Sequence, residues 1–174
     1  MVVLAVVVTA CSALPTGTPE AILNADPELA ARFPSMVAGE PFPVDTIRAE
    51  ASLRLMGVNE AFLEALGADF EDVSVALGHR PMPTATSVHV SASAYRVVGA
   101  NEDRLLEYFI PIMKERSEDI PLVKVTVAGR QVWRPMGKPV AVAGNMLYVH
   151  GDTAYLLYGD HRKVVEELLA ALPR

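Results

Sequence analysis

The feature that most constrains the fold of this sequence is a β-hairpin pattern near its C-terminus. Two segments rich in aliphatic and aromatic residues, 146–150 and 153–158, are separated only by Gly151 and Asp152. Gly-Asp favours a two-residue turn of type I′ or II′, and such a turn fixes which residues of the two strands face each other. The resulting register pairs Val149 with Ala154 and Leu147 with Leu156 on one face, and Tyr148 with Tyr155 and His150 with Thr153 on the other. We expect the face that carries Leu147 to be buried.

A long strand is predicted from the alternation of residues 86–98, and shorter strands are predicted at 42–49, 72–78, 123–127 and 131–134. Alternation of apolar and polar residues is typical of an antiparallel sheet with one face in the core and the other in water. In the long strand the apolar side carries Val88, Val90, Ala92, Ala94 and Val98, and the polar side carries Ser87, His89, Ser91, Ser93 and Tyr95.

Amphipathic helices are predicted after Asn59, Asn101 and Asp160, each of which is a favoured N-cap residue. Apolar residues follow each cap at helical spacing, and Gly67 is placed to end the first of these helices in a left-handed conformation. Pro111 lies inside the second helix, where it removes a hydrogen bond and clashes with the preceding turn, so we expect a kink or a break there. The fold class predicted is α+β, an antiparallel sheet with amphipathic helices packed on one face.

A faint internal repeat is compatible with two ββα units. Residues 94–99 and 154–159 both begin with Ala-Tyr and end with Gly, and each leads into a predicted helix. A tandem ββα duplication would explain the match. Any strand that runs through glycine into a capped helix restricts its own residues in the same way, so both explanations stay open.

The start of the chain indicates where the protein resides. Residues 1–10 carry no charge, and Val8-Thr9-Ala10-Cys11 has the order of a lipobox, in which small residues precede an acceptor cysteine. This start resembles the signal of bacterial lipoproteins. The resemblance implies that 1–10 is a signal peptide removed before Cys11, and that the Cys11 thiol carries diacylglycerol with acyl chains such as palmitate. The protein would then be exported and anchored to the bacterial cell envelope, with the membrane as its partner through this lipid.

The segment 11–19 after the predicted cut is small, uncharged and rich in Pro and Thr, which suits a flexible tether. No Lys or Arg precedes the apolar run, although signal peptides normally begin with a positive charge, which would place the true start upstream of Met1. The run could instead be a buried strand or another export signal. It is shorter than the roughly 20 residues that span a bilayer. We expect one globular α+β domain over 20–174.

A second, less specific resemblance concerns the C-terminal part of the chain. The segments 125–130, 147–152 and 169–173, in this order, look like those of uncharacterised exported bacterial domains. Because such domains have no assigned activity, this resemblance implies no functional residues.

Composition excludes two kinds of chemistry. The 15 Lys and Arg residues against 21 Asp and Glu residues give a net charge of −6, which is poorly suited to nucleic acid, whose binding requires neutralised phosphates. Cys11 is the only cysteine, so no intramolecular disulfide can form.

Sequence motifs for catalysis are absent. The chain has no glycine-rich phosphate loop, no HExxH, no cysteine pair for zinc and no Gly-x-Ser-x-Gly. We therefore predict no catalytic residues, no cofactor and no metal. A metal site from His89, His150 and an acid would form only if their strands were neighbours, and nothing in the spacing requires it.

The residues most suited to ligand contact are His89, Tyr148, His150 and Tyr155, on the sheet face expected to be in water. Tyr148 and Tyr155 could equally be a cross-strand pair that stabilises the hairpin. The leading functional prediction is an envelope-tethered lipoprotein whose domain binds a ligand or an envelope protein without catalysis. The alternatives are an exported enzyme or small-ligand receptor with its site on the solvent face of the sheet, and a purely structural spacer.

Overall fold

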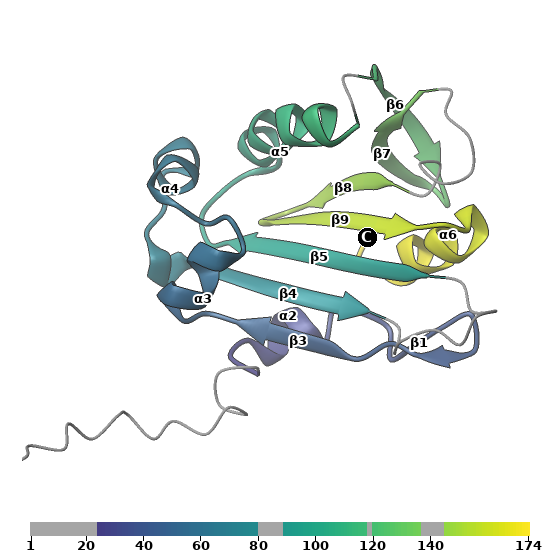
Figure 1. The fold of residues 1–174 in the computed structure, drawn as a ribbon, viewed down its shortest axis with the longest axis horizontal. Helices are drawn as coiled ribbons and strands as arrows, with labels where there is room; N and C mark the ends of the chain where they lie inside the picture. The colour runs from purple at the N-terminus through teal and green to yellow at the C-terminus, as the bar shows by residue number, and fades with distance from the viewer. Residues whose placement is uncertain (1–23, 80–88, 118–119, 137–144) are drawn as a thin grey trace, which may run out of the picture.

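The structure, a computed structural model, describes residues 24–79, 89–117, 120–136 and 145–174 (Figure 1). Cys11, the predicted signal peptide and the tether lie outside the described residues. A seven-stranded antiparallel sheet forms the centre of the described chain. In spatial order its strands are β3 (Val44–Ile47), β4 (Val73–His79), β5 (Val90–Val97), β9 (Thr153–Gly159), β8 (Met146–His150), β7 (Arg130–Pro135) and β6 (Leu122–Val127). The predicted α+β class is confirmed.

The predicted hairpin register is confirmed in β8 and β9. Val149 faces Ala154 and Tyr148 faces Tyr155, and Gly151 has a φ of 59°, in the left-handed region that a tight turn of this kind requires. In the β6–β7 hairpin both turn residues, Ala128 and Gly129, have positive φ angles, of 50° and 77°, whereas in the β8–β9 turn Gly151 alone does.

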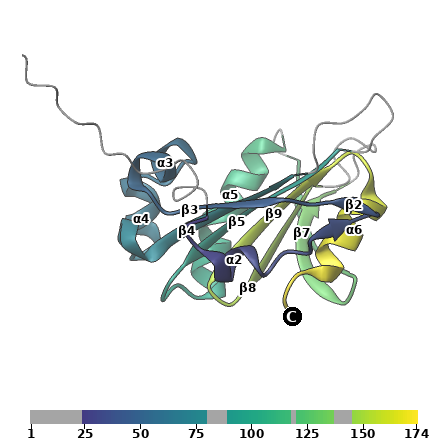
Figure 2. The ribbon, with the colours of Figure 1, turned by 90° about the horizontal axis from the view of Figure 1, so that it is seen from below.

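Helices cover both faces of the sheet, which corrects the expectation of one face in water (Figure 2). One face, called here the α5 face, packs against α3 (Glu50–Leu55), α4 (Glu60–Leu66) and α5 (Glu102–Arg116). The opposite face, called the α6 face, packs against α2 (Pro27–Ala30), α6 (Arg162–Ala171) and the small hairpin of β1 (Met36–Val37) and β2 (Glu40–Pro41).

The pairing of β5 with β9 is the reason that both faces need cover. Tyr95 lies opposite Ala154, and Ala94 lies opposite Tyr155. The polar-looking side of β5 therefore continues into the apolar side of the hairpin, and each face of the sheet presents large apolar area. Burying such area stabilises the fold by about 25 cal/mol per Å², so both faces gain from a helical layer.

The helices arise largely where the sequence predicts them. The Asn59 side chain accepts a hydrogen bond from the Phe62 backbone N–H, and Gly67 ends α4 with a φ of 64°. The Asn101 side chain caps α5 in the same way. At α6 the prediction is wrong by one residue: the N-cap is His161, without a side-chain hydrogen bond. A short 3₁₀ helix at Phe70–Asp72 precedes β4.

Of the kink or break expected at Pro111, the break is absent. The helix α5 continues through the proline, and its apolar residues Leu105, Phe109 and Met113 are buried against the sheet on both sides of it. The helices also argue against a ββα duplication. In the sheet, a two-fold axis normal to its plane would relate the strand pair β4–β5 to the pair β8–β9. A duplication about this axis would place α5 and α6, the helices that follow the two pairs, on the same face of the sheet. The two helices lie on opposite faces.

The C-terminal end of α6 is held by two side chains from the sheet. Arg130 donates hydrogen bonds to the carbonyl oxygens of Leu172 and Pro173. The Tyr148 hydroxyl donates to Pro173 O at 2.8 Å. Among the described residues, no helix combines the length and the apolar character needed to cross a bilayer.

Candidate functional site

Tyr148 and Tyr155 are core residues, which corrects the expectation that they lie on an exposed face. They are 6% and 0% exposed, and their rings stack with centroids 5.7 Å apart. Phe33, which follows α2, packs its ring edge against Tyr155 at 5.8 Å. The helices α2 and α6 cover this side of the hairpin, so neither ring is available to a ligand as predicted.

His89 and His150 are not brought together. His89 is exposed and precedes β5, with its Nε2 atom 3.5 Å from Ser91 Oγ. His150 lies at the other end of the sheet, opposite Thr153, which in turn faces Arg96. The length of β5, about 23 Å at 3.3 Å per residue, separates the ends of the sheet at which the two histidines lie. In the described part of the chain, no group of three or more His, Cys, Asp or Glu side chains is placed to hold a metal ion.

His150 contacts two neighbouring side chains, Tyr148 and Glu102. Its ring stacks on Tyr148 with the two planes inclined by 7° and the centroids 6.3 Å apart. Its Nδ1 atom lies 3.9 Å from Glu102 Oε1, and the same Glu102 carboxylate accepts a hydrogen bond from the Gly151 backbone N–H at 2.8 Å. The first turn of α5 is thereby attached to the β8–β9 turn.

A charged cluster that the sequence does not reveal lies beside this turn. Arg96 Nε donates to Asp152 Oδ2 at 3.1 Å, and Arg32 Nη1 donates to Oδ1 of the same carboxylate at 3.0 Å. Arg96 Nη1 also contacts Asp26 Oδ2 at 3.3 Å, and Arg32 Nη1 contacts Thr153 Oγ1 at 2.6 Å. The cluster joins residues from before α2, after α2, β5 and the β8–β9 turn.

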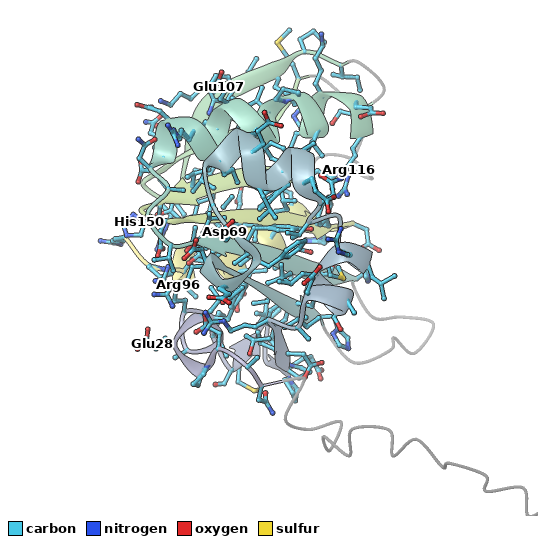
Figure 3. All side chains as sticks on the ribbon, turned by 90° about the vertical axis from the view of Figure 1, so that its left-hand side faces the viewer. Glu28, Asp69, Arg96, Glu107, Arg116 and His150 are labelled. Carbon is cyan, nitrogen blue, oxygen red and sulfur yellow. The ribbon has the colours of Figure 1, made fainter. Side chains whose placement is uncertain are left out.

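Figure 3 shows Arg96 between Glu28 and His150 at this end of the sheet. Glu28, 78% exposed, lies 3.4 Å from Arg96 Nη1 and adds a third carboxylate to the arginine. With Asp26 and Asp152 already bonded to it, Arg96 is enclosed by acidic groups. The cluster therefore offers no free cation to an anionic ligand.

The Asp26 and Asp152 carboxylates of the cluster are held in their charged form. Burial alone would raise the pKa of Asp152, but hydrogen bonds from Thr153, Arg32 and Arg96 bring that pKa below its usual value. Burial would likewise raise the pKa of Asp26. Hydrogen bonds with the Leu29 backbone N–H, Ser74 and Arg96 outweigh this effect, and the pKa is lowered. A general acid or base works best with a pKa near the working pH, and the lowered pKa values of these two carboxyl groups lie far from it. The contacts of the cluster instead attach α2 to the sheet, and in this sense the cluster acts as a clamp.

A pocket of about 340 Å³ opens beside the cluster, with Asp26, Glu28, Arg48 and Arg96 in its wall. Arg48 donates to the Glu71 backbone carbonyl oxygen at 2.8 Å, and Asp26 and Glu28 are both bonded to Arg96. The pocket therefore presents charges of both signs.

The second concave region is a groove of about 420 Å³ between α4 and α5, lined by Ala65, Arg104, Glu107, Tyr108, Pro111 and Ile112. A volume of this size is within the range of small-molecule sites, about 300–1,000 Å³. Most of its exposed lining is apolar, and it has no ion pair across it among the described residues. No sequence pattern predicts this groove, since its apolar residues fit the ordinary amphipathic stripe of a helix.

Beneath the groove lies a smaller pocket of about 70 Å³, whose wall includes Tyr95, Phe109 and Arg116. Burial raises the pKa of both Tyr95 and Tyr108 above the usual value for a phenol. These hydroxyls are therefore neutral hydrogen-bonding groups at physiological pH.

No protein-family model matches this chain, and the searches of curated proteins and of solved structures likewise give no match.

Proposed function

We propose that this protein is an exported bacterial lipoprotein, anchored to the cell envelope through Cys11, whose α+β domain binds a ligand or partner without catalysis. The observation that supports lipid anchoring is the lipobox Val8-Thr9-Ala10-Cys11, which follows an uncharged apolar run. Two acyl chains give stable membrane attachment where a single chain does not, since each buried CH₂ contributes about 0.8 kcal/mol.

The chemistry of the domain supports binding over catalysis. The acidic groups in the charged cluster are paired and kept ionised. The histidines considered for a site are at opposite ends of the sheet, and the tyrosines are buried in the core. The α4/α5 groove supplies the concave, mostly apolar surface that a binding function needs.

The test of anchoring is intact-mass spectrometry of the full chain recovered from the membrane of a bacterial host, beside Cys11→Ser and the control Ser12→Ala. We expect a mature chain that begins at Cys11 and carries diacylglycerol in the parent and in Ser12→Ala, and neither modification in Cys11→Ser. We also expect Cys11→Ser to release the domain into the soluble fraction. A parent chain that keeps residues 1–10 and lacks lipid, or a Cys11→Ser chain that stays in the membrane, contradicts the proposal.

A further inference from the structure

The α4/α5 groove and the pocket beneath it share a wall. Tyr108 and Ile112 line both spaces, and the inner pocket continues inward to Phe62, Tyr95 and Phe109. These rings form a connected aromatic cluster, with centroids of Phe62 and Tyr108 5.0 Å apart and of Tyr95 and Phe109 5.1 Å apart. The surroundings suit a hydrocarbon or aryl group.

The inner pocket has a cationic end. Arg116, in the last turn of α5, lines it and donates to the Tyr158 hydroxyl at 2.8 Å. No carboxylate of the described residues lies within ion-pair distance of Arg116. A guanidinium carries five N–H donors, and Tyr158 is the one side-chain acceptor of Arg116 among the described residues.

The neighbouring hydroxyls favour an anionic acceptor at the same place. Tyr158 uses its oxygen to accept from Arg116 and keeps its own proton to donate. The Tyr95 hydroxyl is already used, because it donates to Met56 O at 3.0 Å. An arginine beside a hydroxyl donor matches the two oxygens of a carboxylate.

The outer end of the groove has a different charge. Glu107 lines it, about 13 Å along the helix from Arg116 at 1.5 Å per residue. Arg104 also lines this end and keeps its positive charge, with its Nη1 atom donating to the Leu66 carbonyl oxygen at 3.3 Å. The charges of Arg104 and Glu107 (labelled with Arg116 in Figure 3) offset each other at that end. The inner end has Arg116 without a carboxylate partner among the described residues, so an amphipathic anion would place its head there.

We propose that the space between α4 and α5 binds a free apolar monocarboxylate, with its carboxylate on the Arg116 guanidinium and the Tyr158 hydroxyl and its hydrocarbon part against Tyr108 and Ile112. The inference deepens the proposed binding function of the domain and rests on it. It does not depend on whether Cys11 is acylated.

The test is calorimetric titration of the full chain with octanoate and with octanol. A lipidated chain is titrated in phospholipid nanodiscs, after subtraction of empty discs, and a chain without lipid is titrated in buffer. We expect octanoate to bind at least tenfold more tightly than octanol. Arg116→Gln removes this preference and leaves octanol binding unchanged, whereas Lys114→Gln, an exposed cation on the same helix, keeps it. Ala65→Trp fills the groove from α4, where residue 65 is exposed, and weakens the binding of both ligands.

The outcomes separate the two proposals. Equal affinity for octanoate and octanol, or a preference that survives Arg116→Gln, overturns the carboxylate assignment and leaves the groove as an apolar binding site. No binding of either ligand, or binding that Ala65→Trp does not weaken, overturns the groove as the binding site as well. Anchoring through Cys11 is decided independently by the intact mass.

Discussion

Arg96 Nε and Asp152 Oδ2 lie 3.1 Å apart, although the two residues are 56 positions apart in the chain. The same carboxylate also holds Arg32, with Nη1 and Oδ1 3.0 Å apart. One side chain in a two-residue turn thus connects a central strand to the segment that follows α2. The contact attaches the first described helix to the sheet, in addition to the core packing of Leu29 and Phe33.

We expect Asp152→Asn to lower the free energy of unfolding by about 2 kcal/mol, because hydrogen bonds to charged partners contribute roughly 1.5–3 kcal/mol each and the amide keeps only part of them. Urea denaturation measures this loss. Asp160→Asn, an exposed carboxylate near the start of α6, is the matched control and should change stability by less than about 0.5 kcal/mol. Equal effects of the two substitutions would contradict a clamp at Asp152.

The lowered pKa values of Asp26 and Asp152 also set a pH dependence. The unfolded chain takes up these protons at a higher pH than the folded chain does. The stabilisation is therefore complete above the usual carboxyl pKa of about 4 and is lost as the pH falls through the lowered folded values. Denaturation midpoints measured from pH 6 to pH 2 should fall less steeply for Asp152→Asn than for the parent. Parallel curves would exclude a contribution of Asp152 to the acid sensitivity.

The two stacked tyrosines should respond differently to the loss of their hydroxyls. Tyr148 donates to Pro173 O at 2.8 Å, so Tyr148→Phe removes a hydrogen bond and should cost about 1 kcal/mol. The Tyr155 hydroxyl is buried without a well-formed hydrogen bond, although Arg32 is close enough to influence it. Tyr155→Phe should therefore be neutral or stabilising. Thermal unfolding of both variants checks this order, and a larger loss at Tyr155 would show that its hydroxyl is satisfied in solution.

Gly78 makes room for a buried ring. A Cβ atom at this position would collide with Cε1 and Cζ of Phe42, whose side chain is buried in the core. We expect Gly78→Ala to cost about 1–3 kcal/mol through overpacking. In a double-mutant cycle with Phe42→Leu, the smaller side chain should relieve most of this cost. Additive effects would show that the strain arises elsewhere.

The sequence alone determined the elements whose causes are local. The register of β8 and β9 depends on two turn residues, Gly151 and Asp152, and the start of α4 and of α5 depends on one asparagine each. These features involve neighbours in the chain, so alternation and capping are sufficient to predict them. The α+β class follows from the same local patterns.

The tertiary structure decided which surfaces are buried and which side chains meet. The pairing of Ala94 with Tyr155 joins strands far apart in the sequence, and it mixes apolar and polar sides so that helices cover both faces. The sequence also could not place Arg32 and Arg96 on Asp152, or Arg116 beside Tyr158, since each contact joins separate elements. Local preferences act over a few residues, whereas such contacts depend on how complete strands and helices pack.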